Sequence, residues 1–148
     1  MIRLLCVGKM KDKSLKNVQD DYLKRLNRLR KVELIELKEG NPQMEDEKII
    51  FDETSRLLKH IKADEFVCLF DLQGTQVDSL EFSKQLDENV KCCAIIGGSM
   101  GVDQRLRDRA DIILSISRMT FPHLLARIIV LEQMYRAYKI INGQRYHK

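Results

Sequence analysis

The 148-residue chain has the length of one domain, and with 44% hydrophobic and 32% charged residues it has the composition of an ordinary globular protein. These proportions exclude a disordered or fibrous protein, and no linker-like stretch divides the chain, so we expect a single domain over residues 1–148. The first apolar run is too short for a signal peptide or a membrane span, which favours a cytoplasmic protein without membrane contact.

Charge is distributed unevenly along the chain although the net charge is only +4. Residues 3–31 carry ten Lys or Arg against three Asp, residues 33–64 carry five against nine acids, and residues 115–148 carry six against one. Two basic ends around an acidic middle are typical of a protein that binds a polyanion, and equally of solvated helix surfaces. Charge alone therefore leaves nucleic-acid binding open.

Five short apolar runs predict the strands, in chain order at residues 2–7, 32–37, 66–70, 92–96 and 112–116. Each run is too continuous for a half-exposed strand, which indicates strands buried on both faces of a mostly parallel sheet. The four cysteines, which lie inside these runs, are predicted to be buried reduced thiols. No His or Cys pair has ligand spacing, so we expect no metal site.

Helical patterns lie between the predicted strands. The first has Leu15, Val18 and Tyr22 at helical spacing after Asp12 as the cap. The predicted helices cover residues 13–29, residues 45–61, a segment capped by Asp78 with Glu81 three positions on, residues 103–109, and a last long helix from near Pro122 to Gly143. Strand and helix alternate throughout, which predicts an α/β fold with a mostly parallel sheet flanked by helices on both faces.

Three loops follow predicted strands, at residues 71–75, 97–101 and 117–121. Because ligands of parallel sheets bind outside the carboxyl ends of the strands, we expect these loops to meet at a binding site. The second loop contains Gly97, Gly98 and Gly101, which allow a backbone to approach a ligand closely. It does not match a known phosphate-binding motif, so a plain structural turn is an equal alternative.

The third loop belongs to the run SRMTFPH at residues 117–123, which gathers a hydroxyl pair, a sulfur, an aromatic ring and a histidine. A structural interpretation is available, in which Thr120 caps the last helix, Met119 and Phe121 cover the core, and His123 bonds a carbonyl. The tail NGQRYHK at residues 142–148 offers Arg145, an aromatic ring, an imidazole and a lysine, which are groups that hold phosphates and stack on unpaired bases.

Five motifs in order resemble one family. They are VGK at residues 7–9, IGG with a following glycine at 96–101, SRMTFPH at 117–123, YRAYKI at 135–140 and the closing YHK. Together they make the chain similar to the RlmH family, the bacterial methyltransferases of large-subunit ribosomal RNA in the trefoil-knotted SPOUT superfamily.

The resemblance implies a deep C-terminal trefoil knot, an exception to the rule that chains stay unknotted. S-adenosylmethionine would be the methyl donor, bound in the knot without a metal. The resemblance also implies a homodimer, with the last helix supplying much of the interface. The cofactor pocket would be lined by Phe70, Gly97, Gly98, Ile116, Ser117, Arg118, Met119, Thr120 and Phe121.

The implied reaction is methylation of the ring nitrogen at position 3 of a pseudouridine in a 23S rRNA stem-loop, on the assembled ribosome. His147 is the first candidate for proximity to the target base and Tyr146 for stacking or a hydrogen bond, with His123 as the alternative base. Arg145 and Lys148 would contact phosphates. Two alternatives stay open, a knotted methyltransferase acting on tRNA and a ribosome-binding module without catalysis.

Overall fold

The computed structural model describes residues 1–146 and contains a five-stranded sheet in the order β2-β1-β4-β3-β5. Every strand pair is parallel, so the predicted α/β fold with a parallel sheet is confirmed. The elements are β1 (Ile2–Val7), α1 (Lys13–Leu29), β2 (Val32–Leu37), α2 (Asp46–His60), β3 (Phe66–Thr75), α3 (Ser79–Glu88), β4 (Cys92–Ile96), α4 (Gln104–Arg109), β5 (Ile112–Leu114) and α5 (His123–Ile141).

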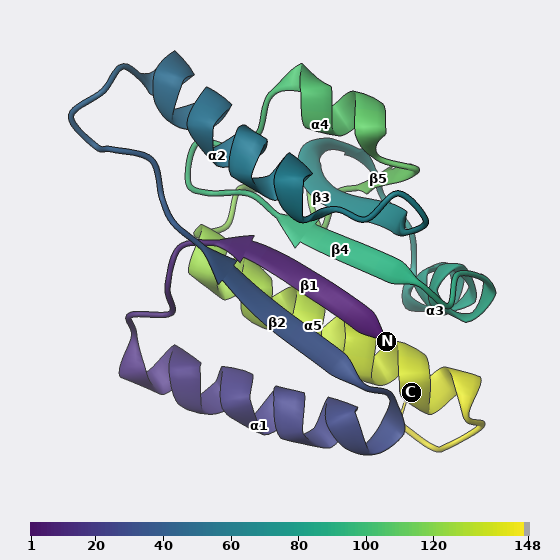
Figure 1. The fold of residues 1–148 in the computed structure, drawn as a ribbon. Helices are drawn as coiled ribbons and strands as arrows, with labels where there is room; N and C mark the ends of the chain where they lie inside the picture. The colour runs from purple at the N-terminus through teal and green to yellow at the C-terminus, as the bar shows by residue number, and fades with distance from the viewer. Residues whose placement is uncertain (147–148) are drawn as a thin grey trace.

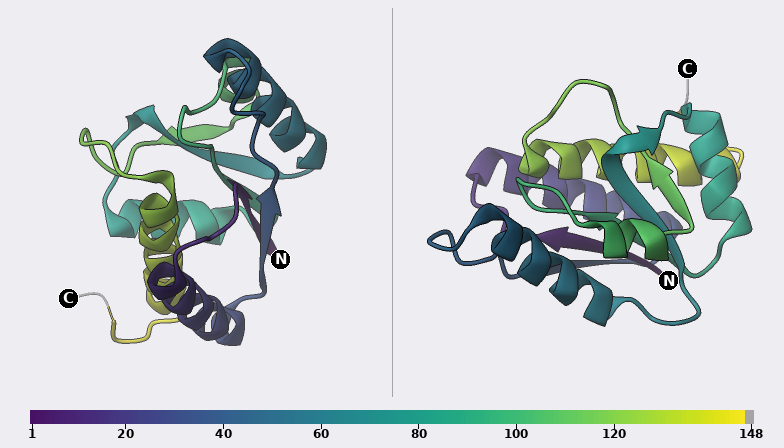
Figure 2. Two further views of the ribbon diagram at one scale, coloured as in Figure 1. Left: turned by 90° about the vertical axis from the view of Figure 1, so that its left-hand side faces the viewer. Right: turned by 90° about the horizontal axis from the view of Figure 1, so that it is seen from above.

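Helices cover both faces of the sheet, as predicted. In Figure 1, α2 and α4 lie above the sheet and α1 and α5 lie below it, and α5 packs against both α1 and α3. Figure 2 shows the same separation from two further directions. The helix α5 runs antiparallel to the strands, so it begins at the carboxyl edge of the sheet and ends toward the amino edge. Among the described residues, no helix has the length and apolarity that crossing a membrane requires.

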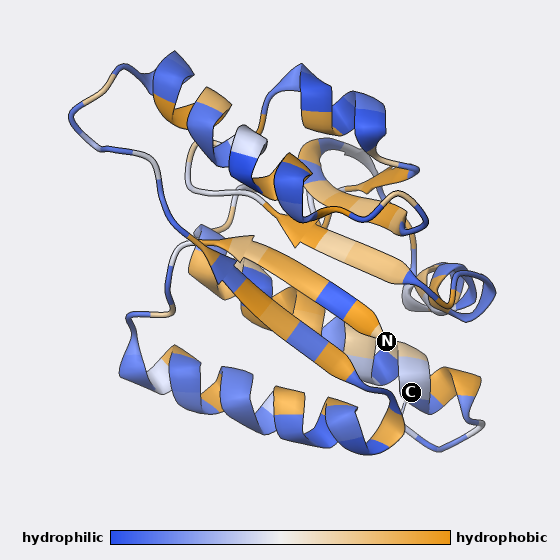
Figure 3. Cartoon of the chain, in the orientation of Figure 1, coloured by the Kyte–Doolittle hydropathy of each residue, from blue (hydrophilic) through white to orange (hydrophobic). Residues whose placement is uncertain are grey.

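The core follows the apolar runs of the sequence. The strands β1 and β4 are buried along their whole length at the centre of the sheet, and Figure 3 shows them largely in the hydrophobic colour while α1 turns a hydrophilic face outward. All four cysteines are free and buried, which confirms that prediction. Burial raises the pKa of the Cys6 thiol to about 12, so this thiol stays protonated and behaves as a small hydrophobic side chain.

Aspartates cap three of the helices. The side chains of Asp12, Asp78 and Asp103 accept hydrogen bonds from backbone N–H groups in the first turns of α1, α3 and α4, as predicted for Asp12 and Asp78. The prediction of which α1 side chains face the core is only partly confirmed. Val18 is exposed, whereas Gln19 is buried because its side chain accepts a hydrogen bond from a buried arginine of α5. The prediction of Val18 as a core-facing position is therefore wrong.

The strand β3 is longer than predicted and curls around the end of β5. It continues past Phe70 to Thr75, and both of these residues are in register with Leu114. At Gly74 a Cβ atom would lie 2.5 Å from the Leu114 carbonyl carbon, so only glycine lets the two backbones approach this closely. The predicted strand at 112–116 is correspondingly short and ends at Leu114, where the chain turns away beside the curl.

A buried ion pair closes the amino edge of the sheet. The Arg3 guanidinium donates to both carboxylate oxygens of Glu65, from Nε to Oε2 over 2.8 Å and from Nη2 to Oε1 over 2.5 Å. It also donates to the carbonyl of His60, and the Lys62 N–H donates to Glu65. The pair thereby ties β1 to the connection between α2 and β3.

Candidate functional site

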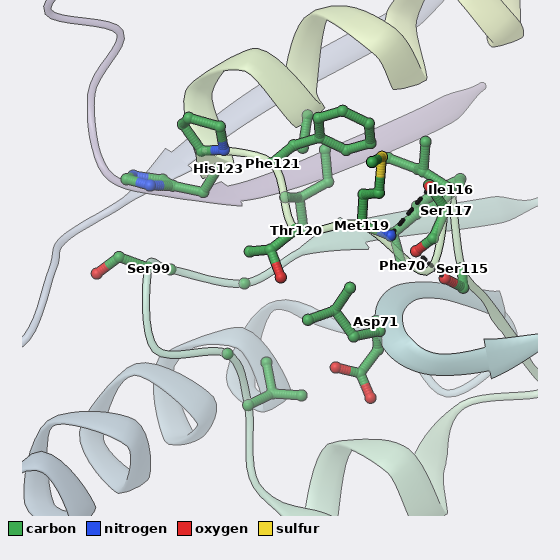
Figure 4. Close-up of a pocket in the computed structure, with 18 residues that line it drawn as sticks. Phe70, Asp71, Ser99, Ser115, Ile116, Ser117, Met119, Thr120, Phe121 and His123 are labelled. Atoms are coloured by element: carbon green, nitrogen blue, oxygen red, sulfur yellow. Dashed lines mark hydrogen bonds between the residues drawn. The ribbon is translucent and has the colours of Figure 1, made fainter.

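Residues 70–72 of β3 and the loops that follow β4 and β5 meet at the carboxyl edge of the sheet, as predicted for this region, although the segment predicted as the first loop, residues 71–75, is part of β3. They surround a cavity of about 540 Å³, a size typical of small-molecule sites. Figure 4 shows the lining residues, with Ser99 and His123 on one side of the cavity and Ser115, Ser117 and Ile116 on the other. The cavity is therefore built by segments that lie far apart in the sequence.

The predicted pocket residues Phe70, Gly97, Gly98, Ile116, Ser117, Met119, Thr120 and Phe121 all line this cavity. Arg118 is exposed and is not among the lining residues. The cavity also contains residues that the sequence did not single out for the pocket, namely Asp71, Leu72, Ile96, Ser99, Gly101, Val102, Ser115, Pro122 and Ala126, together with His123. Four of these lie within the predicted loops, and all the others except Ala126 flank the loops by one or two positions.

The glycine loop is shaped by close contacts on its outer side. A Cβ atom at Gly98 would lie 2.6 Å from the Glu53 carboxylate and 3.2 Å from a methyl group of Val7, so the loop is wedged between α2 and the end of β1. The Gly101 N–H donates to the Gly98 carbonyl over 3.0 Å, and Gly101 has a φ of 81°. These contacts require small residues, and they leave the inner side of the loop facing the cavity.

The loop between β5 and α5 is not explained by packing. Met119 has 74% of its surface exposed and therefore does not cover the core. Thr120 does not cap α5, because the N-cap position is Pro122 and no side chain makes a cap hydrogen bond there. Ser117 organises the loop instead, accepting from the Ser115 hydroxyl at its carbonyl and from the Met119 N–H at its Oγ. The structural interpretation is thus wrong for Met119 and Thr120, and the loop leaves both side chains at the cavity.

The carboxylate in the cavity lining is already paired. Asp71 accepts from Arg107 Nε over 2.9 Å, and both side chains are largely buried. This pairing makes Asp71 a poor candidate for a free general base, since its Oδ2 already accepts a charge-assisted hydrogen bond from the guanidinium. Around it the walls combine apolar side chains and loop backbone with hydroxyl groups such as those of Ser117 and Thr120, a mixture that suits a heterocycle with a polar edge.

A buried arginine, Arg127, fixes the first turns of α5 to the rest of the carboxyl edge. Its Nη2 donates to the Gly8 carbonyl over 2.9 Å, and its Nη1 donates to Glu36 over 2.5 Å and to Gln19 over 3.0 Å. Arg127 is 1% exposed and follows Ala126, a lining residue of the cavity. No spacing rule points to this role of Arg127, because its partners lie in three distant segments.

The tail folds back onto α5 instead of entering this cavity. The Tyr146 hydroxyl donates to Glu132 over 3.0 Å, and its ring lies edge-on to Tyr135 with Arg136 over its face at 4.7 Å. Burial and the Glu132 hydrogen bond raise the pKa of Tyr146 to about 12. The phenol is therefore neutral near pH 7 and acts as a hydrogen-bond donor rather than a base.

The remaining predicted residues are placed as follows. His123 is the first residue of α5 and lines the cavity, whereas Arg145 is exposed in the tail. His147 and Lys148 lie outside the described residues. Within residues 1–146 no group of three or more His, Cys, Asp or Glu side chains could hold a metal ion.

A parallel sheet whose carboxyl-edge loops enclose a cavity beside a glycine turn defines a protein of the α/β class that binds a small ligand at that edge. The family follows from comparison. Residues 1–147 match the family model described as "Predicted SPOUT methyltransferase", and the chain belongs to this SPOUT methyltransferase family. The family predicted from the sequence motifs is thereby confirmed.

Known relatives agree with this assignment over the full length. The chain is 42% identical to "Ribosomal RNA large subunit methyltransferase H" of Caldicellulosiruptor saccharolyticus, covering 100% of both chains, and 42% identical to the protein of the same name from Clostridium botulinum strain Alaska E43, covering 99% of both. The fold is similar to that of a solved "probable methylase family protein" from Haemophilus influenzae Rd KW20, with a TM-score of 0.53, 15% identity, and coverage of 96% of this chain and 66% of that one.

Proposed function

We propose that this protein transfers a methyl group from S-adenosylmethionine to ribosomal RNA of the large subunit. The observation that carries the proposal is the cavity at the carboxyl edge, built from the residues that the family motifs pick out. The names of the full-length relatives support the substrate class. A ribosomal substrate implies work in the cytoplasm, and within the RNA we propose nitrogen 3 of a pseudouridine in a 23S stem-loop, on the assembled ribosome.

The cavity fits the proposed cofactor in size and in chemistry. Its volume of about 540 Å³ holds a molecule of nucleoside size, and its walls combine apolar side chains with loop backbone. Phe70 and Ile116 would pack against the adenine, while backbone groups of the glycine loop and of the loop around Ser117 would bind its polar edge and the ribose. The cofactor supplies an electrophilic methyl group when bound, which leaves the protein to position the target and manage its proton.

The target nitrogen carries a proton near neutral pH, so the active site must favour its removal. His123 is the described imidazole at the cavity, and as a neutral base it could accept that proton. His147 is the other candidate and lies outside the described residues. In either case the side chain would hold the proton at a ring nitrogen while neighbouring cations stabilise the anionic base.

The position of the tail supports a site shared between two subunits. Tyr146 is docked on Glu132, nine positions after His123 in α5, which is ~13 Å along the helix axis. Within one subunit, Tyr146 and the cavity are thus held apart. We propose that the protein is a homodimer and that the tail of one subunit serves the cavity of the other.

Apolar side chains around the cavity support such a dimer. Leu72, Leu80, Met119 and Leu125 are exposed, and a second cavity of about 360 Å³ lies between α3 and α5 beside the first. A soluble protein seldom leaves so many large apolar residues open in one region without a partner. Many of the large apolar side chains of α5, by contrast, are buried in the core of the subunit itself.

We also propose that the C-terminal segment is knotted, with the curl of β3 as the loop. Phe70 and Thr75 both pair with Leu114, so the curl closes around the end of β5 just before the chain continues into α5. This arrangement supports a passage of the chain through the curl, in the manner that the family resemblance implies.

The proposed function is tested by incubating the protein with labelled S-adenosylmethionine and ribosomes that lack the mark. We expect label in 23S rRNA, at a pseudouridine once the product is digested and separated. Label in tRNA instead would replace the substrate assignment, and cofactor binding without label in ribosomes or free rRNA would refute it. Absence of cofactor binding in calorimetry would identify a binding module without catalysis.

The role of the tail is tested by deleting residues 146–148. We expect the fold and cofactor affinity to change little, because Tyr146 is not among the described residues that line the cavity, while methyl transfer falls by about 100-fold or more. Circular dichroism, calorimetry and the labelling assay measure the three quantities. Loss of cofactor binding in the deleted protein would show that the tail belongs to the cofactor pocket.

A further inference from the structure

The VGK motif at residues 7–9 has no role in the function proposed so far. It follows β1, the neighbour of β4 in the sheet, with Cys6 in register with Ile96. Val7 contacts the position of Gly98 in the glycine loop, as the 3.2 Å approach of its methyl group to a Cβ there shows. The motif therefore stands at the carboxyl edge, directly beside the loop that lines the cavity.

Buried and partly buried groups hold the backbone of this motif on both sides of Lys9. The Gly8 N–H donates to the Leu37 carbonyl over 2.7 Å, and the Gly8 carbonyl accepts from Arg127 Nη2 over 2.9 Å. On the other side, the Met10 N–H donates to Glu36 Oε2 over 2.8 Å. Because Glu36 Oε2 also accepts from Arg127, one ion pair fixes both flanking residues.

The conformation at Gly8 is one that glycine alone adopts without strain. Its φ is 93°, and a Cβ atom there would lie 2.6 Å from Glu39 Oε1. Three features thus hold this turn of two or three residues. They are the positive φ of Gly8, the buried guanidinium of Arg127 and the carboxylate of Glu36, which accepts from Met10. Burying an arginine is costly, and the hydrogen bonds of both Nη atoms of Arg127 offset part of this cost while they hold the turn.

Lys9 is the residue that this turn presents. It is exposed, and within residues 1–146 no carboxylate forms an ion pair with it. Lys11 and Lys13 follow, also exposed and likewise without an ion pair in the described part of the chain. The acid between them, Asp12, is occupied in capping α1. The turn therefore forms a cationic rim beside the cavity.

We propose that Lys9 binds a phosphate of the RNA whose target base enters the cavity, and that the turn held by Arg127 and Glu36 is a rigid mount for this contact. The proposal rests on the proposed function, since it names a contact of the same substrate. Lys9 is not a lining residue of the cavity, which assigns it to the polyanion outside and not to the cofactor within. Lys11 and Lys13 extend the same rim along the RNA backbone.

The test compares Lys9→Ala with Lys9→Arg and with Lys59→Ala as a matched control. Lys59 is an exposed lysine in the last turn of α2, at the opposite edge of the sheet. For Lys9→Ala we expect KM for ribosomes lacking the mark to rise by about fivefold with kcat nearly unchanged. The slope of log Kd for these ribosomes against log salt should fall by about one. Lys9→Arg should restore most of both, and Lys59→Ala should resemble the unmodified protein.

The outcomes separate this inference from the proposed function. If the unmodified protein labels 23S rRNA while Lys9→Ala keeps its KM and salt slope, the phosphate contact is refuted and the function stands. A lowered affinity of Lys9→Ala for S-adenosylmethionine in calorimetry would also refute it, because the lysine would then serve the cofactor. Failure of the unmodified protein to label any rRNA would instead refute the function on which the inference rests.

The mount is tested separately by Gly8→Ala, which keeps every charge. An alanine is strained at the Gly8 φ of 93°, which would force the turn to shift, and the exposed Glu39 side chain would have to move aside. In the folded fraction, verified by circular dichroism, we expect the same rise in KM as for Lys9→Ala and an unchanged cofactor affinity. A folded Gly8→Ala protein with unaltered KM would show that the position of the turn does not matter and would overturn the mount.

Discussion

The two edges of the sheet each bury an arginine, and the two arginines are used differently. At the amino edge Arg3 pairs with Glu65, and both side chains are no more than 7% exposed. At the carboxyl edge Arg127 is equally buried, but its partner Glu36 is 31% exposed and the groups around it form a cavity and a cationic turn. The Arg3–Glu65 pair links neighbouring segments at the amino edge, whereas the Arg127–Glu36 pair holds the exposed turn and the start of α5 in position at the carboxyl edge.

This difference shows where function can be located without knowing the ligand. At the amino edge, an ion pair and backbone contacts occupy Arg3 and Glu65. At the carboxyl edge, Met119, Thr120 and Lys9 are exposed, and within residues 1–146 their side chains make no hydrogen bond or ion pair. Loops on a rigid scaffold are where binding and catalytic residues concentrate.

The largest effect is expected from Gly74→Val, because at Gly74 the backbone of β3 lies very close to that of β5 at the carboxyl edge. The new side chain would overlap the backbone of Ile113 and Leu114, where a Cβ alone would lie within 2.8 Å of both. We expect a loss of about 3 kcal/mol in the free energy of unfolding, measured with urea, and no detectable cofactor binding.

The matched control for this change is Gln73→Ala, an exposed neighbour in the same curl. It should change the free energy of unfolding by less than about 0.5 kcal/mol and leave cofactor affinity intact. A Gly74→Val protein as stable as the unmodified one would mean that the curl yields easily, and the proposed knot would lose its main support.

The next largest effect is expected when each buried arginine is replaced by methionine, which compares the two edges of the sheet directly. Arg3→Met and Arg127→Met should each lower the free energy of unfolding by about 3 kcal/mol, because each leaves a carboxylate without its partner. The loss for Arg127→Met should be the smaller one, since Glu36 can turn to water. Urea titrations measure both losses.

Activity should then distinguish the two variants where stability does not. Per folded molecule, Arg3→Met should transfer methyl groups at the original rate, while Arg127→Met should be impaired in KM for ribosomes because Gly8 and α5 lose a common anchor. Equal activities of the two variants, assayed at a temperature where both are folded, would contradict the functional difference between the edges.

Local patterns were enough to predict the sheet and the position of the cavity. Apolar runs such as residues 92–96 can only be buried strands, and parallel strands bring their following loops to one edge. The family motifs then selected the pocket residues, with Arg118 as the one that the cavity does not include.

Long-range pairing is what the sequence could not reveal. Arg127 binds Gln19 and Glu36, which lie 108 and 91 positions away, and no spacing rule connects them. The prediction that Val18 faces the core is wrong for the same reason, since the buried Gln19 accepts a hydrogen bond from the distant Arg127. The segment at 71–75 looked like a loop because its strand character depends on pairing with β5, some forty positions later.

The smallest expected effect concerns the pH dependence of the amino edge. Burial raises the pKa of Glu65, but the hydrogen bonds from Arg3 and from the Lys62 backbone outweigh it, so this pKa lies below its usual value of 4.5. A lowered folded-state pKa stabilises the protein above the unfolded-state pKa, and this stabilisation disappears as the pH falls through the folded value. Glu65→Gln should therefore be less stable than the unmodified protein by about 2 kcal/mol at pH 7, and the difference should shrink toward zero in acid below pH ~4.

Asp64→Asn is the control for this pH dependence, because Asp64 pairs with Lys91 in the same connection but at an exposed position. Water and salt screen this pair, so its removal should leave the pH profile of unfolding unchanged. If Glu65→Gln and the unmodified protein instead lose stability in parallel as the pH falls, Glu65 does not carry the acid sensitivity of the amino edge. The Arg3–Glu65 pair would then stabilise the fold through its packing and not through the charge of Glu65. The two arginines would differ only in their surroundings.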